Sequence, residues 1–454
     1  MSSPVPAAAG SGGNRGPGPR SSSSTGSRTA PGSLAVIGAG AAGCAGVAAL
    51  RRQGWAGPIS LWESGRGPGG RTATRRSRTD PGLRLDHGAP MFNLTASPPP
   101  ALLEPLLAGG WIEPFTDPIA QLDGQGQLHP GGTAPYGLGS LYRGQGGMEQ
   151  LCRGLLEQAG PGVETHFGQL VRHLEVTPQR RWRLLGPDRQ TLAEVDWLVL
   201  SGTLLAHPRS RLLLDWPEVP LAAAAAQLQD PQLQHVLAVL ASIQSEARSN
   251  LLLVVPAAAA APWRKLPFRL LEFSEAAQLR WNLSRLSVQP LADGRCAVVA
   301  HSSATFASEH LSVYGSRSSI ASQLGVTPRP EQEQAVIEAL TAALRDALGQ
   351  ALGRWFSAAA LRRSLAGERQ LMRWGAAFPR APGLPLELAL CPTSRVGFCG
   401  DYVAGPGFGR VEGALRSAEA LAGRLLAAAA GESAAAAAVN NRCESRRGPT
   451  PLLG

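Results

Sequence analysis

The sequence predicts an α/β fold in which a parallel sheet covered by helices is interrupted by a second, mostly antiparallel sheet. An apolar run at residues 34–37 precedes a helical pattern over 41–53 and a second apolar run at 59–62, which is the order strand, helix, strand. Near the other end of the chain, a strand-like run at 396–401 precedes an alanine-rich helical pattern over 411–430. The long region between these two parts mixes strand-like and helical patterns, so we expect an inserted domain there.

The remaining elements follow in order along the chain. From residue 143, a glycine-rich turn leads into a helical pattern over 148–159. Strand-like runs come next, at 170–176, 180–185 and 197–201. The clearest patterns in the middle of the chain are strands at 251–255, 270–273 and 296–301 and a helix over 332–352. We therefore expect a first domain built from residues 33–90, 143–204 and 386–430, and a second domain built from residues 91–142 and 205–385.

Both ends of the chain have a low-complexity composition. Residues 1–32 are mostly Ser, Gly, Pro, Ala and Arg, and residues 431–454 return to a biased composition. Such segments offer little apolar surface to bury, so we expect both to be disordered. An N-terminal tail that has Ser and Arg but no acids is also typical of a plastid transit peptide. Two locations therefore stay open: the cytoplasm of a bacterium or cyanobacterium, and a plastid.

The composition is that of a globular protein long enough for two domains, with 454 residues, 44% hydrophobic and 17% charged. The formal net charge of +10 favours an anionic partner. The arginines have no interleaved aromatic residues, however, and no helix-turn-helix pattern accompanies them, so we expect no nucleic-acid partner. Attraction of an anionic cofactor or a phosphorylated substrate explains the charge equally well.

Cysteine spacing and hydropathy exclude two further classes of protein. The six cysteines are scattered along the chain without any paired spacing, so we expect neither a disulfide framework nor a metal site. No apolar run reaches the length that a transmembrane helix needs, so we expect no transmembrane segment.

A glycine-rich turn directly follows the first strand. Its sequence is Gly38-Ala39-Gly40-Ala41-Ala42-Gly43. In this spacing the first glycine permits a tight turn, the second lets the backbone approach a pyrophosphate, and the third lets helix and strand pack closely. The N–H groups that open the helix can then bind phosphates. Glu63 ends the second strand 20 residues after Gly43, where a carboxylate would meet a ribose hydroxyl. This part of the sequence predicts a dinucleotide site with contacts from Gly38, Gly40, Ala42, Gly43 and Glu63.

A second glycine-rich segment follows Glu63. It reads Ser64-Gly65-Arg66-Gly67-Pro68-Gly69-Gly70-Arg71-Thr72. Glycines suit backbone that lies against a flat ligand, and the guanidinium fork of Arg71 suits pyrophosphate oxygens. The pattern resembles the signature of the flavin amine oxidase superfamily, in which a Gly-Gly-Arg turn follows the strand that ends on the acid. The resemblance implies a Rossmann-type FAD-binding domain with an inserted substrate domain, as in amine oxidases and p-hydroxybenzoate hydroxylase, and cofactor contacts from Gly70, Arg71 and Thr72.

The C-terminal strand carries a third motif, in which Gly400-Asp401 ends the strand and Val411 begins the next helix. In the superfamily that this pattern resembles, the acid binds the ribityl-phosphate region of FAD and the helix N-terminus points at the flavin. The resemblance therefore covers about 34–90 and 395–428, and implies cofactor contacts from Gly400, Asp401 and Val411. We expect the neighbouring Cys399 to be a small buried residue, and FAD to be bound non-covalently.

Three further segments resemble the renalase-like proteins. Residues 85–92 and 144–148 are similar to segments that line the flavin in that family, and residues 370–375 are similar to one that places a Trp beside the ring. The resemblance implies a functional role for Trp374. His87 either donates to the flavin or the substrate, or is a turn histidine. Relatives often carry His at the position of Met372, so an acid–base role there is absent or has moved. The cofactor contacts expected from this part of the comparison are Gly88, Ala89, Gly147 and Met148, together with Val171 on the strand-like run at 170–176.

The resemblance implies an FAD-dependent oxidoreductase that transfers a hydride from a small donor to the flavin, with O2 as the acceptor. In the renalase-like family the donor is a misreduced dihydronicotinamide, but nothing in residues 205–370 identifies a substrate. One alternative is a flavin amine oxidase or a desaturase-like enzyme, although four tyrosines are little material for an aromatic cage. Another alternative is a flavin-binding partner protein without turnover.

Overall fold

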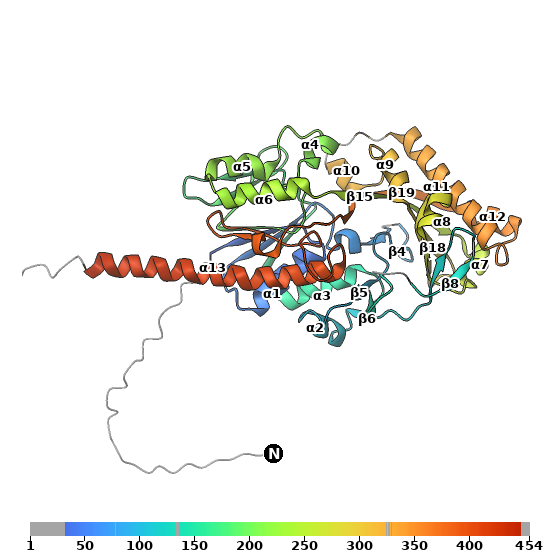
Figure 1. Ribbon diagram of the computed structural model, residues 1–454, viewed down its shortest axis with the longest axis horizontal. Coiled ribbons are helices and arrows are strands. Elements are labelled where there is room, and N and C mark those ends of the chain that lie inside the picture. The colour runs from blue at the N-terminus through green and yellow to red at the C-terminus, as the bar shows by residue number, and fades with distance from the viewer. Residues whose placement is uncertain are drawn as a thin grey trace, which may run out of the picture.

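Two lobes make up the described part of the chain, as a computed structural model shows (Figure 1). The structure describes residues 32–77, 79–132, 136–323, 325, 327 and 329–445. One lobe is built on a parallel sheet and the other on a mostly antiparallel sheet, which confirms the predicted fold class. The tails expected at the two ends lie outside the described residues, apart from Gly32 and residues 431–445.

The sheet of the first lobe has six strands. In spatial order they are β10 (Val163–Phe167), β2 (Ile59–Glu63), β1 (Leu34–Ile37), β14 (Trp197–Leu200), β21 (Val396–Phe398) and β20 (Leu390–Cys391). The pairs are parallel except for β20 with β21. Val36 lies between Leu61 and Val199, and all three are buried because both faces of the sheet are covered. The apolar runs of the sequence therefore form a Rossmann-type sheet.

One face of this sheet is covered by three helices: α1 (Ala41–Arg52), α3 (Glu149–Ala159) and α13 (Val411–Ser445). Helix α1 contacts the other two, and its small residues permit the close packing, since a Cβ added to Gly46 would lie 4.0 Å from Ala418 of α13. A small sheet and one helix complete this side: β5 (Phe92–Leu94), β9 (Ser140–Gly144), β6 (Ile112–Pro114) and α2 (Leu103–Ala108).

The opposite face is covered by a three-stranded sheet and three helices. These are β11 (His173–Val176), β12 (Trp182–Leu185), β13 (Thr191–Val195), α4 (Arg209–Leu214), α5 (Pro220–Leu228) and α6 (Pro231–Ser242). Trp182, Leu221 and Leu233 pack in one core with Trp62 and Leu198 of the parallel sheet. We expect residues 205–385 in the second domain, but α5 and α6 bury their apolar faces against the first lobe.

The sheet of the second lobe has seven strands. In spatial order they are β19 (Glu368–Pro379), β15 (Ser245–Val255), β18 (Cys296–Ser302), β17 (Leu283–Pro290), β16 (Leu270–Phe273), β7 (Ile119–Leu122) and β8 (Leu128–Pro130). Only the β16–β7 pair is parallel among these described strands. The mostly antiparallel inserted sheet is thus confirmed.

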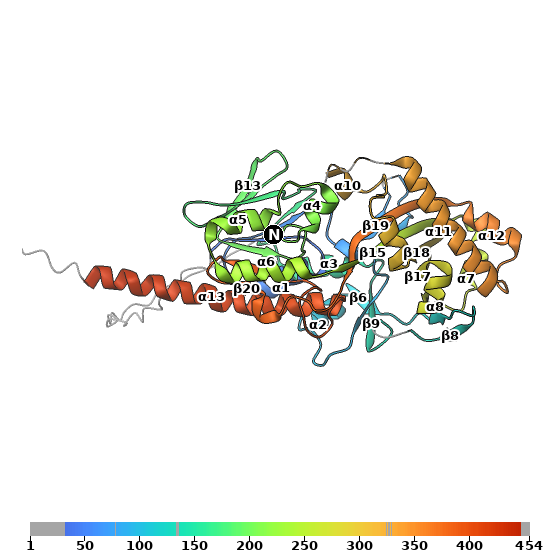
Figure 2. The ribbon, with the colours of Figure 1, turned by 45° about the horizontal axis from the view of Figure 1, so that its top comes forward.

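Helices cover one face of this second sheet, and Figure 2 shows α11 (Pro330–Ala351) and α12 (Ala358–Leu365) along it. Alternate strand residues such as Leu251, Leu253 and Val298 join Leu340 and Leu344 of α11 in one buried core. The other face turns toward the first lobe. The remaining elements are short: η1 (Gly70–Thr72), β3 (Thr74–Arg76), β4 (Arg84–Asp86), η2 (Ala257–Ala259), α7 (Ala261–Arg264), α8 (Glu275–Trp281), α9 (Ala304–Glu309), α10 (Ser319–Gln323) and η3 (Leu386–Leu388).

Helix α13 and strand β19 differ from the sequence-based prediction. Helix α13 continues to Ser445 and projects beyond the first lobe, although we expect its end near residue 430 (Figure 1). Residues 434–438 are all alanine, the residue with the highest helix propensity, so the low-complexity composition extends the helix. Strand β19 is twelve residues long and was not predicted, because its partly exposed side chains form no apolar run. None of the helices in the described residues combines the length and apolar character needed to cross a membrane.

Candidate functional site

A cavity of about 500 Å³ is lined by residues from both lobes. The first lobe contributes the carboxyl ends of β1, β2 and β14, where ligands bind in open parallel sheets. The second lobe contributes side chains of β15, β17, β18 and β19. The cavity has the size of a ligand or cofactor pocket and is the candidate site.

The glycine-rich turn after β1 forms the first wall of the cavity. Gly38 has a positive φ of 101°, and its N–H donates to the carbonyl of Trp62 at 2.7 Å. A Cβ on Gly43 would lie 1.8 Å from the Gly38 oxygen, so only glycine lets α1 begin this close to the strand. Helix α1 has no side-chain cap at Gly40, and its first-turn N–H groups lack intrahelical acceptors. Gly40, Ala41 and Ala42 line the cavity, which suits an anionic group.

Glu63 joins the two glycine-rich segments. One carboxylate oxygen accepts from the N–H of Ala39 at 2.8 Å, and the other accepts from the N–H of Gly65 at 2.6 Å. The same side chain lines the cavity. Each carboxylate oxygen can accept more than one hydrogen bond, so Glu63 can hold the turn and still accept from a ribose hydroxyl.

Arg71 and Asp401, which lie far apart in the sequence, contact each other. The two terminal nitrogens of Arg71 donate to the two oxygens of Asp401, both at 2.6 Å. Arg71 also donates to the carbonyl of Ala377 on β19 at 2.6 Å. This bidentate pair connects the N-terminal motif, the C-terminal motif and the second lobe at one wall of the cavity.

Arg209 is a cavity residue that sequence analysis missed. It lies at the start of α4, and no acidic side chain of the described residues forms an ion pair with it. Burial, and then the charge of Arg71, lower the pKa of Arg209 to about 10, so it stays cationic at neutral pH. A lone arginine in a loop-to-helix segment gives no sequence signal, because only the fold brings it next to Arg71.

Residues 85–92 and 144–148 meet at Asp86. One Asp86 oxygen accepts from the hydroxyl of Thr74 at 2.6 Å and from the N–H of Met148 at 2.9 Å. Burial raises the pKa of Asp86 to about 6. The following Gly88 packs so tightly on Arg71 that a Cβ there would lie 2.0 Å from the Arg71 oxygen. These contacts fix the wall that Gly88 and Ala89 contribute to the cavity.

Trp374 lines the cavity, whereas His87 lies behind it. The two rings are stacked, with centroids 5.5 Å apart and an angle of 12° between their planes. The His87 carbonyl accepts from the side-chain amide of Asn250 at 2.8 Å and from the Trp374 indole N–H at 3.4 Å. Burial lowers the pKa of His87 to about 4, so its imidazole is neutral at physiological pH. The geometry makes His87 a support for Trp374.

Most of the predicted site residues lie on this cavity. Those that line it are Gly38, Gly40, Ala42, Glu63, Gly70, Arg71, Thr72, Gly88, Ala89, Val171, Trp374, Gly400, Asp401 and Val411. Gly43, Gly147 and Met148 do not line it and instead pack behind its wall. The expected burial of Cys399 is confirmed, since its thiol lies 3.8 Å from the carbonyl oxygen of Ala42 inside the protein core.

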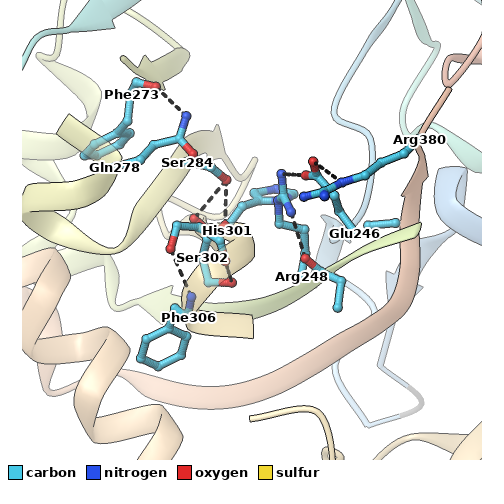
Figure 3. Close-up of polar contacts among 12 residues, drawn as sticks. Glu246, Arg248, Phe273, Gln278, Ser284, His301, Ser302, Phe306 and Arg380 are labelled. Carbon is cyan, nitrogen blue, oxygen red and sulfur yellow. Dashed lines mark hydrogen bonds and ion pairs between the residues drawn. The ribbon is translucent and has the colours of Figure 1, made fainter. Parts of the chain in front are cut away.

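The second-lobe wall contains polar residues that the sequence analysis did not single out. Strand pairing places Arg285 beside His301, His301 beside Asn250, and Asn250 beside Met372, so one row crosses four strands on the same face. Figure 3 shows His301 and Arg248 close together on this face. The alternation of Arg285, Ser287 and Gln289 with Leu286 and Val288 is the sequence signal that could have marked this face.

Burial keeps His301, the histidine of this row, in its neutral form. It lowers the pKa of His301 well below the usual range, and the charges of Arg285 and Arg248 act in the same direction. His301 is therefore neutral at physiological pH, and its Nε2 has no hydrogen-bond partner among the described residues. No group of three or more His, Cys, Asp or Glu side chains in the described ranges is placed to hold a metal ion.

Comparison with known proteins identifies the fold. Residues 36–104 match the family described as NAD(P)-binding Rossmann-like domain. Cyclohexylamine oxidase from Brevibacterium oxydans aligns with 87% of this chain and 98% of its own, at 13% identity and a TM-score of 0.54. The chain has the fold of the amine oxidases.

Two further structures share this amine oxidase fold. A putrescine oxidase variant with redesigned cofactor binding aligns with 87% of this chain and 99% of its own, at 14% identity and a TM-score of 0.52. A candidate protoporphyrinogen oxidase from an Exiguobacterium species aligns with 87% of this chain and 98% of its own, at 12% identity and a TM-score of 0.53. Comparison with curated proteins by sequence gives no match. The similarities therefore establish the architecture alone.

Proposed function

We propose that this protein is an FAD-dependent oxidoreductase of the renalase-like type. The observation that carries the proposal is the convergence of three sequence motifs on one cavity that both lobes line. The first turn of α1, Glu63 and the Arg71–Asp401 pair all face it, and they come from residues 38–43, 63–72 and 400–411.

The residues present fit FAD along the length of the cofactor. The free N–H groups of Ala41 and Ala42 would hold the pyrophosphate, and Glu63 would accept from the adenosine ribose. Asp401 and Arg71 would hold the ribityl-phosphate region, and the start of α13 at Val411 would lie near the flavin. No cysteine is among the described residues that line the cavity, which supports non-covalent binding.

Bound FAD would supply the redox chemistry, as acceptor of a hydride from the donor and as the source of two electrons that, with two protons, convert O2 to hydrogen peroxide. The protein positions the donor and excludes water. Trp374 is proposed to form one wall for the reacting rings, and the neutral His87 stacks behind it and keeps it in place. His87 would remain neutral above a pH of about 4, so it is not suited to act as a general acid at neutral pH.

The donor that the sequence resemblance favours is a misreduced dihydronicotinamide, which needs no general base because it releases a hydride directly. Purified protein loaded with FAD is mixed without oxygen with a preparation of reduced NAD(P) that contains such isomers. The proposal predicts that the yellow absorbance of the flavin bleaches within the mixing experiment. Admission of air should restore the colour and yield hydrogen peroxide.

If the flavin of the FAD-loaded protein stays oxidised after mixing with the reduced NAD(P) preparation, the proposed donor is wrong. A Trp374→Ala variant that bleaches as fast as the unmodified protein would refute the role of Trp374. Leu279→Ala is the matched control, since Leu279 is 77% exposed and lies outside the cavity lining.

A further inference from the structure

We propose that the electron donor combines a flat ring with an anionic group, a carboxylate or a phosphate, and that Arg285 and Arg248 bind this anion. The inference rests on the proposed function, because it names the substrate class of that same cavity. It follows from the side chains that project from the antiparallel sheet toward the first lobe.

The charge of the cavity lining is strongly unbalanced. Six arginines and two acidic residues of the described chain line it. Both acids, Glu63 and Asp401, belong to the first lobe, where Glu63 binds backbone N–H groups and Asp401 pairs with Arg71. The second-lobe lining contains Arg248, Arg285 and Arg373 and no acidic residue among those described. This half of the cavity therefore favours an anion over a cation.

Arg285 projects from β17, and its side chain is only 14% exposed. One of its terminal nitrogens lies 3.5 Å from a Glu272 oxygen, which is a long contact for a buried ion pair. Its guanidinium carbon lies 4.8 Å from the ring centre of Tyr136. Arg285 thus keeps guanidinium N–H groups available beside an aromatic ring.

Arg248 projects from β15, and its side chain is 11% exposed. It donates to Glu246 at 2.7 Å, but Arg380 contacts the other oxygen of Glu246 at 3.3 Å (Figure 3). Two guanidinium groups therefore share one carboxylate, and this cluster keeps a net positive charge. The Arg248 guanidinium carbon also lies 5.1 Å from the ring centre of Phe378.

His301 and two aromatic rings complete the binding surface. Neutral His301 stands next to Arg285 in the strand register, and its unpartnered Nε2 can hydrogen-bond a ligand. The ring centres of Tyr136 and Phe378 lie 5.8 Å apart. Arg285 lies over the Tyr136 ring and Arg248 over the Phe378 ring, so the two rings connect the two arginines. Flat rings stack on such aromatic side chains, and guanidinium forks bind carboxylate or phosphate oxygens in pairs. An alkylammonium substrate would instead meet a wall with a net positive charge.

The test measures binding of small probes to FAD-loaded protein, by the change in flavin absorbance and by calorimetry. The probes are benzoate, phenyl phosphate, benzyl alcohol and benzylamine. Benzoate or phenyl phosphate should bind at least tenfold more tightly than benzyl alcohol, and benzylamine should bind more weakly than the alcohol. The tighter of the two anions identifies the carboxylate or the phosphate as the recognised group.

Substitution of the arginines locates the anion. Arg285→Met and Arg248→Met should each weaken binding of the preferred anion by about 10- to 100-fold, the range for lost hydrogen bonds to a charged group. Arg285→Lys should recover part of that loss. Arg354→Met is the matched control, since this exposed arginine of the second lobe lies over the Trp355 ring and outside the cavity lining.

Two results would overturn the inference. One is benzylamine binding that is tighter than that of both anions, and the other is an anion affinity that both methionine variants leave unchanged. Equal FAD content of all variants shows that their folds are intact. Failure to load any FAD would instead refute the proposed function, and calorimetry on the FAD-free protein would still compare the same probes. The two failures are therefore distinguishable.

Discussion

Glu63 shows how one side chain serves both the fold and the proposed site. Its two oxygens accept backbone N–H groups of Ala39 and Gly65, and its carboxylate faces the cavity. Loss of the carboxylate would therefore remove the proposed ribose partner and the hydrogen bonds that hold both glycine-rich turns. The residue was predicted from its position at the end of β2, whereas its role in holding the turns could be read only from the structure.

We expect Glu63→Ala to raise the dissociation constant of FAD by about 10- to 100-fold, because hydrogen bonds to a charged group are worth about 1.5–3 kcal/mol. Titration of the FAD-free protein, followed by quenching of flavin fluorescence, measures this. Glu164→Ala on the neighbouring strand β10 is the control and should leave the affinity unchanged, since Glu164 is exposed and outside this cavity. Equal affinities for the two variants would contradict the placement of the adenosine.

Asp86 predicts a specific dependence of stability on pH. Burial raises the pKa of Asp86 from 3.8 to about 6 in the folded protein. Between these values the folded chain holds more protons than the unfolded chain, so the free energy of unfolding falls as pH rises from about 4 to about 6. The loss from this one group is on the order of 3 kcal/mol at neutral pH.

Asp86→Asn should remove this part of the pH dependence, because an asparagine oxygen still accepts from Thr74 and Met148 but does not titrate. Urea unfolding of both proteins at pH 4 and pH 7 measures the difference. The variant should gain stability relative to the unmodified protein at pH 7 and little at pH 4. A constant difference across the two pH values would show that the carboxyl does not titrate as described.

At the scale of elements, the junction of β1 and α1 depends on glycine. A Cβ on Gly43 would lie 1.8 Å from the Gly38 oxygen, so Gly43→Ala must push the helix away from the strand. We expect a loss of about 1–3 kcal/mol in the free energy of unfolding, the usual cost of overpacking. Gly431→Ala on α13 is the matched change, since nothing lies within 4 Å of a Cβ there.

The control should stabilise the protein by about 0.5–1 kcal/mol, because alanine replaces glycine in an exposed stretch of helix. Chemical unfolding of both variants gives the comparison. If Gly43→Ala were as stable as Gly431→Ala, the close contact between strand and helix would not exist.

The elements also show which parts of the fold can be predicted from sequence. β1, α1 and β2 were predicted almost to the residue, because short apolar runs with glycine-marked ends have few alternative interpretations. Edge strand β19 was missed, since Arg369, Arg373 and other polar side chains interrupt its pattern. The arginines of the second lobe were missed for a different reason. Arg248, Arg285 and His301 meet through strand register, which depends on partners far apart in the sequence.

At the scale of the whole molecule, the cavity links the two lobes, so a ligand that fills it should stabilise both. FAD at about 100 times its dissociation constant would add about 2.7 kcal/mol to the stability of the form that binds it. We therefore expect the melting temperature to fall by a few degrees when FAD is removed, as measured by circular dichroism. The Glu63→Ala variant should show a smaller shift at the same FAD concentration. Identical melting curves with and without FAD would contradict this linkage.

The most direct test of the account is a binding titration of the purified, cofactor-free protein with FAD, and separately with NAD, by calorimetry. Three motifs converge on one cavity, and two of them, the Gly70–Arg71 turn and Asp401, are what distinguish an FAD site from an NAD site in this account. The account predicts one FAD bound per chain, released intact on denaturation, and an affinity for NAD at least 100-fold weaker. Binding of NAD that equals or exceeds that of FAD, or no binding of FAD at all, would contradict it.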